Sequence, residues 1–194
     1  MKLNLPNKLT LLRLIMIPVC MAFIVFPIGE GDLLWRFLSA AVFGLASLTD
    51  FIDGKIARKY GLITDFGKFI DPLADKLLVF GAMLAILVRY RGDGLFCSVF
   101  VWAVFLVILR EIAVTSLRMI AAQKAGLVIP AAWLGKVKTV TQMVCILTLL
   151  LEGALPFETH GILGYITIAA MVIMTLWSGI DYLRLYLPLL DPEK

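Results

Sequence analysis

The stretch DFIDGKIARKYGLITDFGKFIDPLAD, residues 50–75, decides how this sequence is interpreted. It places four carboxylates between long apolar runs: Asp50, Asp53, Asp71 and Asp75. An ionised carboxylate near a bilayer core is costly and needs a partner, so each of the four is a candidate functional residue. The partner that we expect is a divalent cation, because hard cations prefer oxygen ligands.

The composition predicts an integral membrane protein. The chain has 194 residues, of which 61% are hydrophobic and only 16% are charged, and its mean hydropathy is +0.97. Soluble domains carry about 25% charged residues. The net charge is +4, but the basic residues are scattered between apolar runs and form no basic stripe, so we expect no nucleic-acid partner.

Outside the aspartate segment, apolar runs long enough to cross a bilayer recur along the chain. They predict an all-α, polytopic membrane protein with six transmembrane helices, in one domain that covers residues 1–194. The opening segment, residues 4–13, is more amphipathic and is expected to lie along the membrane surface. The six predicted spans are 9–28, 33–48 continuing to 57, 69–88, 95–109 continuing to 122, 131–151 and 162–187.

The basic residues predict the orientation. With the N-terminus inside, all but three of the 18 Lys and Arg residues lie on the cytoplasmic side, and only Arg36, Arg89 and Arg91 lie outside. Cytoplasmic loops carry such an excess of positive charge. We therefore expect both termini and the aspartate segment to face the cytoplasm.

Helical spacing divides the aspartate segment into two stripes, because residues three or four apart share a helix face. The two stripes would face each other across a cleft, where four carboxylates repel one another unless cations lie between them. Oxygen-only ligands indicate Mg²⁺ or Mn²⁺, and the number of carboxylates favours two ions. The first stripe is Asp50, Asp53, Gly54 and Ala57, and the second is Gly67, Asp71 and Asp75.

The non-acidic members of the segment suit a phosphate ligand. Gly54, Ala57 and Gly67 carry little or no side chain, so a ligand or a neighbouring helix can approach the backbone closely. Arg58 can pair with a phosphate. Metals beside phosphate-binding positions suit in-line displacement at phosphorus.

The full pattern resembles the motif of the CDP-alcohol phosphatidyltransferase family. It reads Asp50-x2-Asp53-Gly54-x2-Ala57-Arg58-x8-Gly67-x3-Asp71-x3-Asp75 and agrees at every fixed position. The resemblance implies six transmembrane helices, a homodimer and a cavity open to the cytoplasm. It also implies transfer of a substituted phosphate from a CDP-linked donor to an alcohol, with release of CMP.

The resemblance also implies roles for individual residues. Asp50, Asp53 and Asp71 resemble the metal ligands, and Asp75 resembles the residue that both neighbours the metals and acts as general base. The residues that resemble the contacts to the cytidine diphosphate are Asp50, Gly54, Ala57, Arg58, Gly67 and Asp71.

Basic residues later in the chain suggest where the acceptor binds. Arg110 and Arg118 fall within one helical arc of the fourth predicted span, and Lys136 and Lys138 open the fifth. Together they would form a cationic pocket suited to an acceptor that is itself a phosphate. The alternative is that they are ordinary positive-inside anchors.

Longer stretches resemble one bacterial branch of the family. They are NLPNKLTLLRLIMIP, FGKFIDPLADKLL, REIAVTSLRMIAA and WLGKVKTVTQ. This resemblance implies a protein of the bacterial cytoplasmic membrane that transfers the phosphatidyl group of CDP-diacylglycerol to sn-glycerol 3-phosphate and releases CMP. In the opening stretch, Asn7, Thr10 and Arg13 are expected to border the cavity.

Other functions stay open from the sequence alone. Within the family, the acceptor would instead be phosphatidylglycerol, serine or an inositol phosphate, and serine gives a cationic pocket the least to bind. A divalent-cation transporter is a more distant alternative, because intramembrane carboxylates also mark ion pathways.

Overall fold

The computed structural model describes residues 4–26, 32–60, 64–125, 133–155 and 159–186. It does not describe the side chains of residues 5, 50, 51, 53, 54, 56–59, 65, 68 and 122–125 within the helices. The described residues form α-helices and one short 3-10 helix. In order they are α1 (Leu5–Val25), α2 (Asp32–Tyr60), α3 (Asp65–Arg89), α4 (Gly94–Ala125), α5 (Trp133–Leu151), η1 (Glu152–Ala154) and α6 (Ile162–Tyr186).

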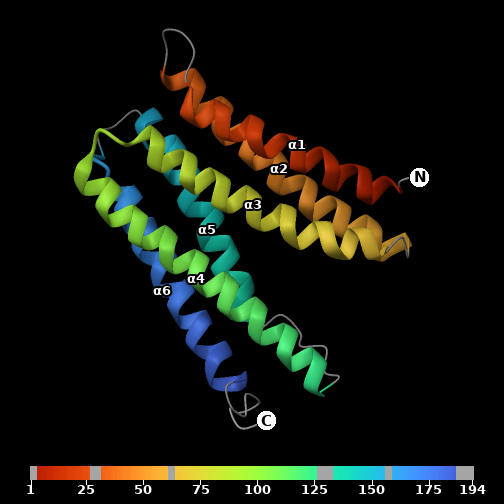
Figure 1. Cartoon of the computed structure of the whole chain (residues 1–194). Helices are drawn as coiled ribbons and strands as arrows, with labels where there is room; N and C mark the ends of the chain where they lie inside the picture. The colour runs from red at the N-terminus through yellow and green to blue at the C-terminus, as the bar shows by residue number, and fades with distance from the viewer. Residues whose placement is uncertain (1–3, 27–31, 61–63, 126–132, 156–158, 187–194) are drawn as a thin grey trace.

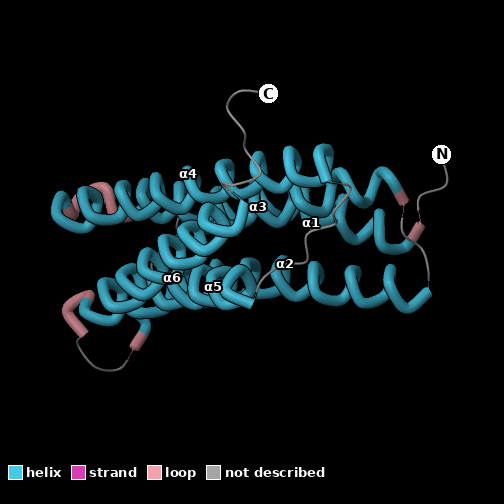
Figure 2. The backbone as a smooth tube through the Cα atoms, turned by 90° about the horizontal axis from the view of Figure 1, so that it is seen from below, coloured by secondary structure: helices cyan, strands magenta, loops and turns pink. Residues whose placement is uncertain are grey.

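The six α-helices form two layers of three. Helices α1, α3 and α4 make one layer, and α2, α5 and α6 make the other. Figure 2 shows the two layers one above the other. Across the layers α1 packs on α2, α3 on α5 and α4 on α6. In Figure 1 the groups α1–α3 and α4–α6 lie closest near the turn between α3 and α4, and diverge toward the other end.

Local signals set where the helices begin. Pro6 lies in the first turn of α1, where its missing N–H costs no intrahelical bond. Thr64 caps α3, because its hydroxyl accepts a 3.0 Å hydrogen bond from the Gly67 backbone N–H. Glu152 caps α6 by accepting from the backbone N–H groups of Leu163 and Gly164.

The larger of the two hydrophobic clusters among the described residues runs through both layers. Its fully buried members come from several helices and include Ile24, Phe43, Met83, Phe100, Ile146 and Met171. Large apolar side chains are also exposed on every α-helix. An apolar outer surface over a packed interior is what a protein surrounded by lipid presents.

Among the described residues, five helices are long and apolar enough to span a membrane: α1, α2, α4, α5 and α6. The third predicted span corresponds to α3, which does not reach that standard. Its first half carries Asp71, Asp75 and Lys76, and it ends at Arg89. The all-α, multi-pass class is therefore confirmed, with five spans supported in place of six.

The opening segment is not separate from the first span. Residues 5–13 form the first turns of a continuous α1, and Asn7, Thr10 and Arg13 are buried. Their polar groups make contacts within the protein. The position of this stretch along the membrane surface stays a prediction.

Candidate active site

Five residues of the predicted motif lie on the second half of α2. The backbone there is helical through Tyr60, as the motif spacing predicts, and α2 packs against α3. Their side chains lie outside the described part of the chain, so their roles stay predictions. These residues are Asp50, Asp53, Gly54, Ala57 and Arg58.

The motif residues of α3 are in contact with α1. The Thr10 hydroxyl lies 2.7 Å from Asp71 Oδ1 and 3.1 Å from the Pro6 carbonyl. The carboxylate is the closer and stronger acceptor, so we assign the hydroxyl proton to it. Thr10 thus fixes one oxygen of a predicted metal ligand.

Gly67 allows two neighbours to approach the start of α3. A Cβ at this position would lie 3.1 Å from Asn7 Oδ1 and 3.3 Å from Thr64 Oγ1. The Thr64 hydroxyl also donates a 3.1 Å hydrogen bond to Asn7 Oδ1. A larger residue at this position would crowd both Asn7 and Thr64.

The donor chemistry of the motif fits a hard divalent cation. Asp71 and Asp75 lie one turn apart on α3, and α2 carries Asp50 and Asp53 beside it. Among the described side chains no group of three His, Cys, Asp or Glu residues comes together, but this search leaves out two of the four carboxylates. An all-carboxylate set on two packed helices suits Mg²⁺ or Mn²⁺.

A cavity of about 860 Å³ opens between α3, α4, α5 and α6 beside Asp75. We call it the cationic cavity. It brings together the predicted base and all four predicted acceptor residues. Its charged lining residues are Asp75, Lys76, Arg110, Glu111, Arg118, Lys136 and Lys138.

Glu111 joins two of these cations. Its Oε1 accepts from Arg110 at 3.0 Å and also from the Lys138 ammonium. The guanidinium of Arg110 further donates to Ser178 and lies 5.4 Å from the centre of the Tyr182 ring. Arg110 and Lys138 are therefore held in place by α4 and α6 before any ligand binds.

Sequence reasoning did not identify Lys76 as a site residue. Its ammonium donates a 2.6 Å hydrogen bond to Thr115 Oγ1 and lies in the wall of the cationic cavity. A basic residue directly after the proposed base Asp75 was the available signal. Glu111 directly follows Arg110 in the sequence, but its bond to Lys138 depends on the register between α4 and α5.

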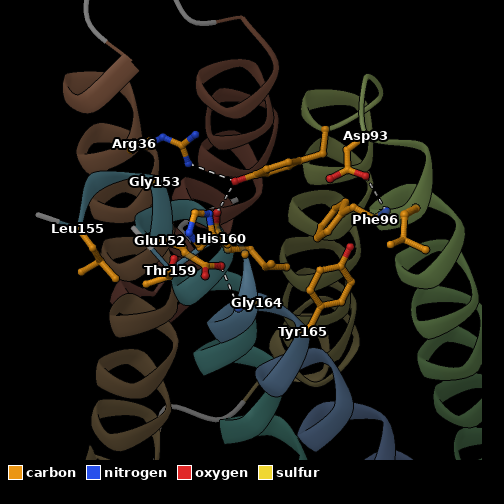
Figure 3. Close-up of a pocket in the computed structure, with 14 residues that line it drawn as sticks. Arg36, Asp93, Phe96, Glu152, Gly153, Leu155, Thr159, His160, Gly164 and Tyr165 are labelled. Atoms are coloured by element: carbon orange, nitrogen blue, oxygen red, sulfur yellow. Dashed lines mark hydrogen bonds between the residues drawn. The ribbon is translucent and has the colours of Figure 1, made fainter. Parts of the chain in front are cut away.

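A second cavity, of about 680 Å³, lies at the opposite end of the helices (Figure 3). Arg36 donates to the Tyr90 hydroxyl at 3.1 Å, and that hydroxyl donates to the Leu149 carbonyl at 2.9 Å. Glu152 accepts from the Gly164 backbone N–H at 2.8 Å. One set of hydrogen bonds links α2, the end of α3 and α5, and another joins η1 to α6, so the polar groups of this cavity serve structural contacts. No residue of the predicted site lines it.

Fold and site together define an all-α membrane protein with a carboxylate motif beside a cationic cavity. The family model described as CDP-alcohol phosphatidyltransferase matches residues 3–177. The chain belongs to the CDP-alcohol phosphatidyltransferase family, and the resemblance seen in the motif is confirmed.

Three bacterial relatives cover nearly the whole chain. A CDP-diacylglycerol–glycerol-3-phosphate 3-phosphatidyltransferase of Bacillus subtilis is 41% identical over 188 residues, which is 92% of this chain and 93% of the relative. A protein of the same name from Rickettsia felis is 37% identical over 186 residues, or 93% and 94% of the two chains. A probable phosphatidylglycerophosphate synthase of Mycobacterium tuberculosis is 37% identical over 179 residues, or 92% and 79%.

Proposed function

We propose that this protein transfers the phosphatidyl group of CDP-diacylglycerol to sn-glycerol 3-phosphate, giving phosphatidylglycerophosphate and CMP. The observation that carries the proposal is the cationic cavity, in which Asp75 shares one wall with five basic side chains. The relatives from Bacillus subtilis and Rickettsia felis bear the name of this reaction.

The charge of the cavity favours an acceptor that carries a phosphate monoester. Its described lining has five cations and two carboxylates, a net charge of +3. A phosphate monoester carries about −1.5 to −2 near pH 7. Phosphatidylglycerol has only a phosphodiester and serine has no phosphate, so both neutralise this cavity less well.

The four predicted acceptor residues divide into two groups. Arg110 and Lys138 are held by Glu111, whereas Arg118 and Lys136 are exposed side chains on the same cavity. We assign the direct contacts to the acceptor phosphate to Arg118 and Lys136. Arg110 and Lys138 then attract the phosphate from deeper in the wall.

The motif residues bind the donor in this proposal. Asp50, Gly54, Ala57, Arg58, Gly67 and Asp71 contact the cytidine diphosphate. The carboxylates Asp50, Asp53, Asp71 and Asp75 would hold Mg²⁺ or Mn²⁺, which would supply positive charge to the diphosphate. Thr10 keeps the Asp71 carboxylate oriented toward this ligand set.

The transfer is a single displacement at phosphorus. The acceptor hydroxyl oxygen attacks the phosphorus that bears the diacylglycerol, and the bond from that phosphorus to CMP breaks. Asp75 takes the hydroxyl proton. We assign to Arg58 the screening of the charge of the departing CMP.

The reaction takes place at the cytoplasmic face of the bacterial inner membrane. The excess of basic residues at one end of the helices supports this orientation, with both termini inside. The family resemblance supports a homodimer.

An acceptor panel tests the proposal. The purified protein is reconstituted with CDP-diacylglycerol and Mg²⁺ or Mn²⁺ and is given each acceptor separately, with CMP release as the readout. We expect release with glycerol 3-phosphate. CMP release only with phosphatidylglycerol, serine or an inositol phosphate would show that this compound, and not glycerol 3-phosphate, is the acceptor. Metal uptake by vesicles that lack CDP-lipid, without CMP release, would favour the transporter.

A further inference from the structure

A small chamber lies behind the cationic cavity and shares five of its residues. Both spaces are lined by Asp75, Lys76, Glu111, Lys138 and Thr139, and the chamber adds Val79, Phe80 and Gln142. Its volume is about 10 Å³. One buried water needs roughly 10–15 Å³, so the chamber is of the size for a single water molecule.

Gln142 indicates what the chamber holds. The residue follows Lys138 by one helical turn on α5, so both side chains lie on the face toward α3 and α4. Gln142 is only 2% exposed, and its Nε2 finds no hydrogen-bond partner among the described residues. An unpaired buried donor costs about 1–3 kcal/mol, so a polar partner is expected at this point.

We propose that the chamber binds one ordered water and that Gln142 is a positioning residue for Asp75. The water accepts hydrogen bonds from the Gln142 amide and the Lys138 ammonium. It donates to the two carboxylates that line the chamber, Asp75 and Glu111. All four hydrogen-bonding positions of the water are then used, as buried waters with several polar partners require.

The water fixes the orientation of the Asp75 carboxylate from the side of the chamber. Asp75 also lines the cationic cavity, where the acceptor hydroxyl binds in the proposed function. A base that is about 1 Å out of place loses much of its effect, so a bond that fixes the carboxylate raises kcat. This role of Asp75 rests on the proposed function, whereas the water site itself does not.

Thr175 provides a matched control. It is 0% exposed, its Oγ1 also finds no partner among the described residues, and it lines neither the chamber nor the cationic cavity. Thr175→Val and Gln142→Met each replace a buried polar side chain by an apolar one of similar size. If both residues are merely unpaired, both variants gain stability.

The experiment compares the thermal midpoints and kinetics of these variants. We expect Gln142→Met to lower the thermal midpoint and to reduce kcat roughly tenfold or more, with both KM values nearly unchanged. Thr175→Val should keep kcat and hold or raise the midpoint. A stabilised Gln142→Met with unaltered kcat would overturn the proposal.

An experimental structure of the wild type, at a resolution that shows water molecules, tests whether the chamber holds a water without the use of any variant. Density within hydrogen-bond distance of Gln142 Nε2 is expected, and an empty chamber would refute the water. A wild type that releases no CMP with glycerol 3-phosphate would instead refute the proposed function, and would leave the density and the stability comparison valid.

Discussion

Thr10 and Asp71, which are 61 positions apart in the chain, meet through a 2.7 Å hydrogen bond from the Thr10 hydroxyl to Asp71 Oδ1. The bond joins the first helix to the carboxylate motif. Thr10 is buried and α1 packs closely on α3, so the contact is fixed by the helix pair. The opening stretch of the sequence is therefore part of the site and is more than a membrane anchor.

The Thr10 contact predicts a defect in metal binding. Thr10→Val keeps the shape of the side chain but removes the donor, so Asp71 loses its outer partner. We expect roughly 10- to 100-fold weaker Mn²⁺ binding, as when other residues that hydrogen-bond to a metal ligand are replaced. The measurements are the Mn²⁺ dependence of CMP release and the electron paramagnetic resonance spectrum of bound Mn²⁺. Thr10→Ser keeps the hydroxyl and should restore both, and equal Mn²⁺ affinity in all three proteins would contradict the role.

Arg118→Ala tests the acceptor side of the cavity. A hydrogen bond to a charged group is worth about 1.5–3 kcal/mol, so we expect the KM for glycerol 3-phosphate to rise about tenfold or more. The KM for CDP-diacylglycerol should change little. Arg91→Ala, at the opposite end of the helices, is the control and should alter neither constant. A donor KM that rises as much as the acceptor KM would remove Arg118 from the acceptor contacts.

Asp75→Asn tests the base. The amide keeps the size of the side chain but does not take a proton, so CMP release should fall by about 100-fold or more. Binding of a CDP-lipid should remain measurable by calorimetry. Asp93→Asn makes the same change beyond the far end of α3, where Asp93 accepts from the Phe96 backbone N–H, and should keep its turnover. Turnover of Asp75→Asn at the wild-type rate would refute the assignment.

The sequence predicted the helices better than their ends. The third apolar run was expected to begin at residue 69, but α3 begins at Asp65 because Thr64 caps it. The polar turn between these positions lowers the local hydropathy, so a criterion of apolarity misses it. Charged residues further along the helix, Asp71, Asp75, Lys76 and Arg89, explain why α3 does not count as a span by composition.

The sequence predicted which residues share a helix face in the candidate site, but it did not predict the contacts between helices. Spacing along one helix was enough to select Asp71, Asp75, Arg110 and Arg118, because residues three and four apart share a face. The bond of Lys76 to Thr115 joins two different helices. Such contacts depend on how far one helix is shifted along another, and a single sequence holds no direct record of that shift.

Glu111→Gln tests whether the cavity depends on its central carboxylate. The change leaves Arg110 and Lys138 without their counter-charge in a buried setting, where Glu111 is 9% and Lys138 5% exposed. Breaking such a pair costs about 3–5 kcal/mol, so the free energy of unfolding in a denaturing-detergent titration should fall by about that amount.

The double variant Glu111→Gln/Lys138→Met separates stability from binding. Removing the ammonium as well takes away the uncompensated charge, so much of the lost stability should return. The KM for glycerol 3-phosphate should be higher in the double variant than in Glu111→Gln, because the cavity then has one cation fewer and the same number of carboxylates. If the single variant is as stable as the wild type, Glu111 is not the residue that holds the two cations. If the double and the single variant have the same KM, Lys138 contributes nothing to the acceptor.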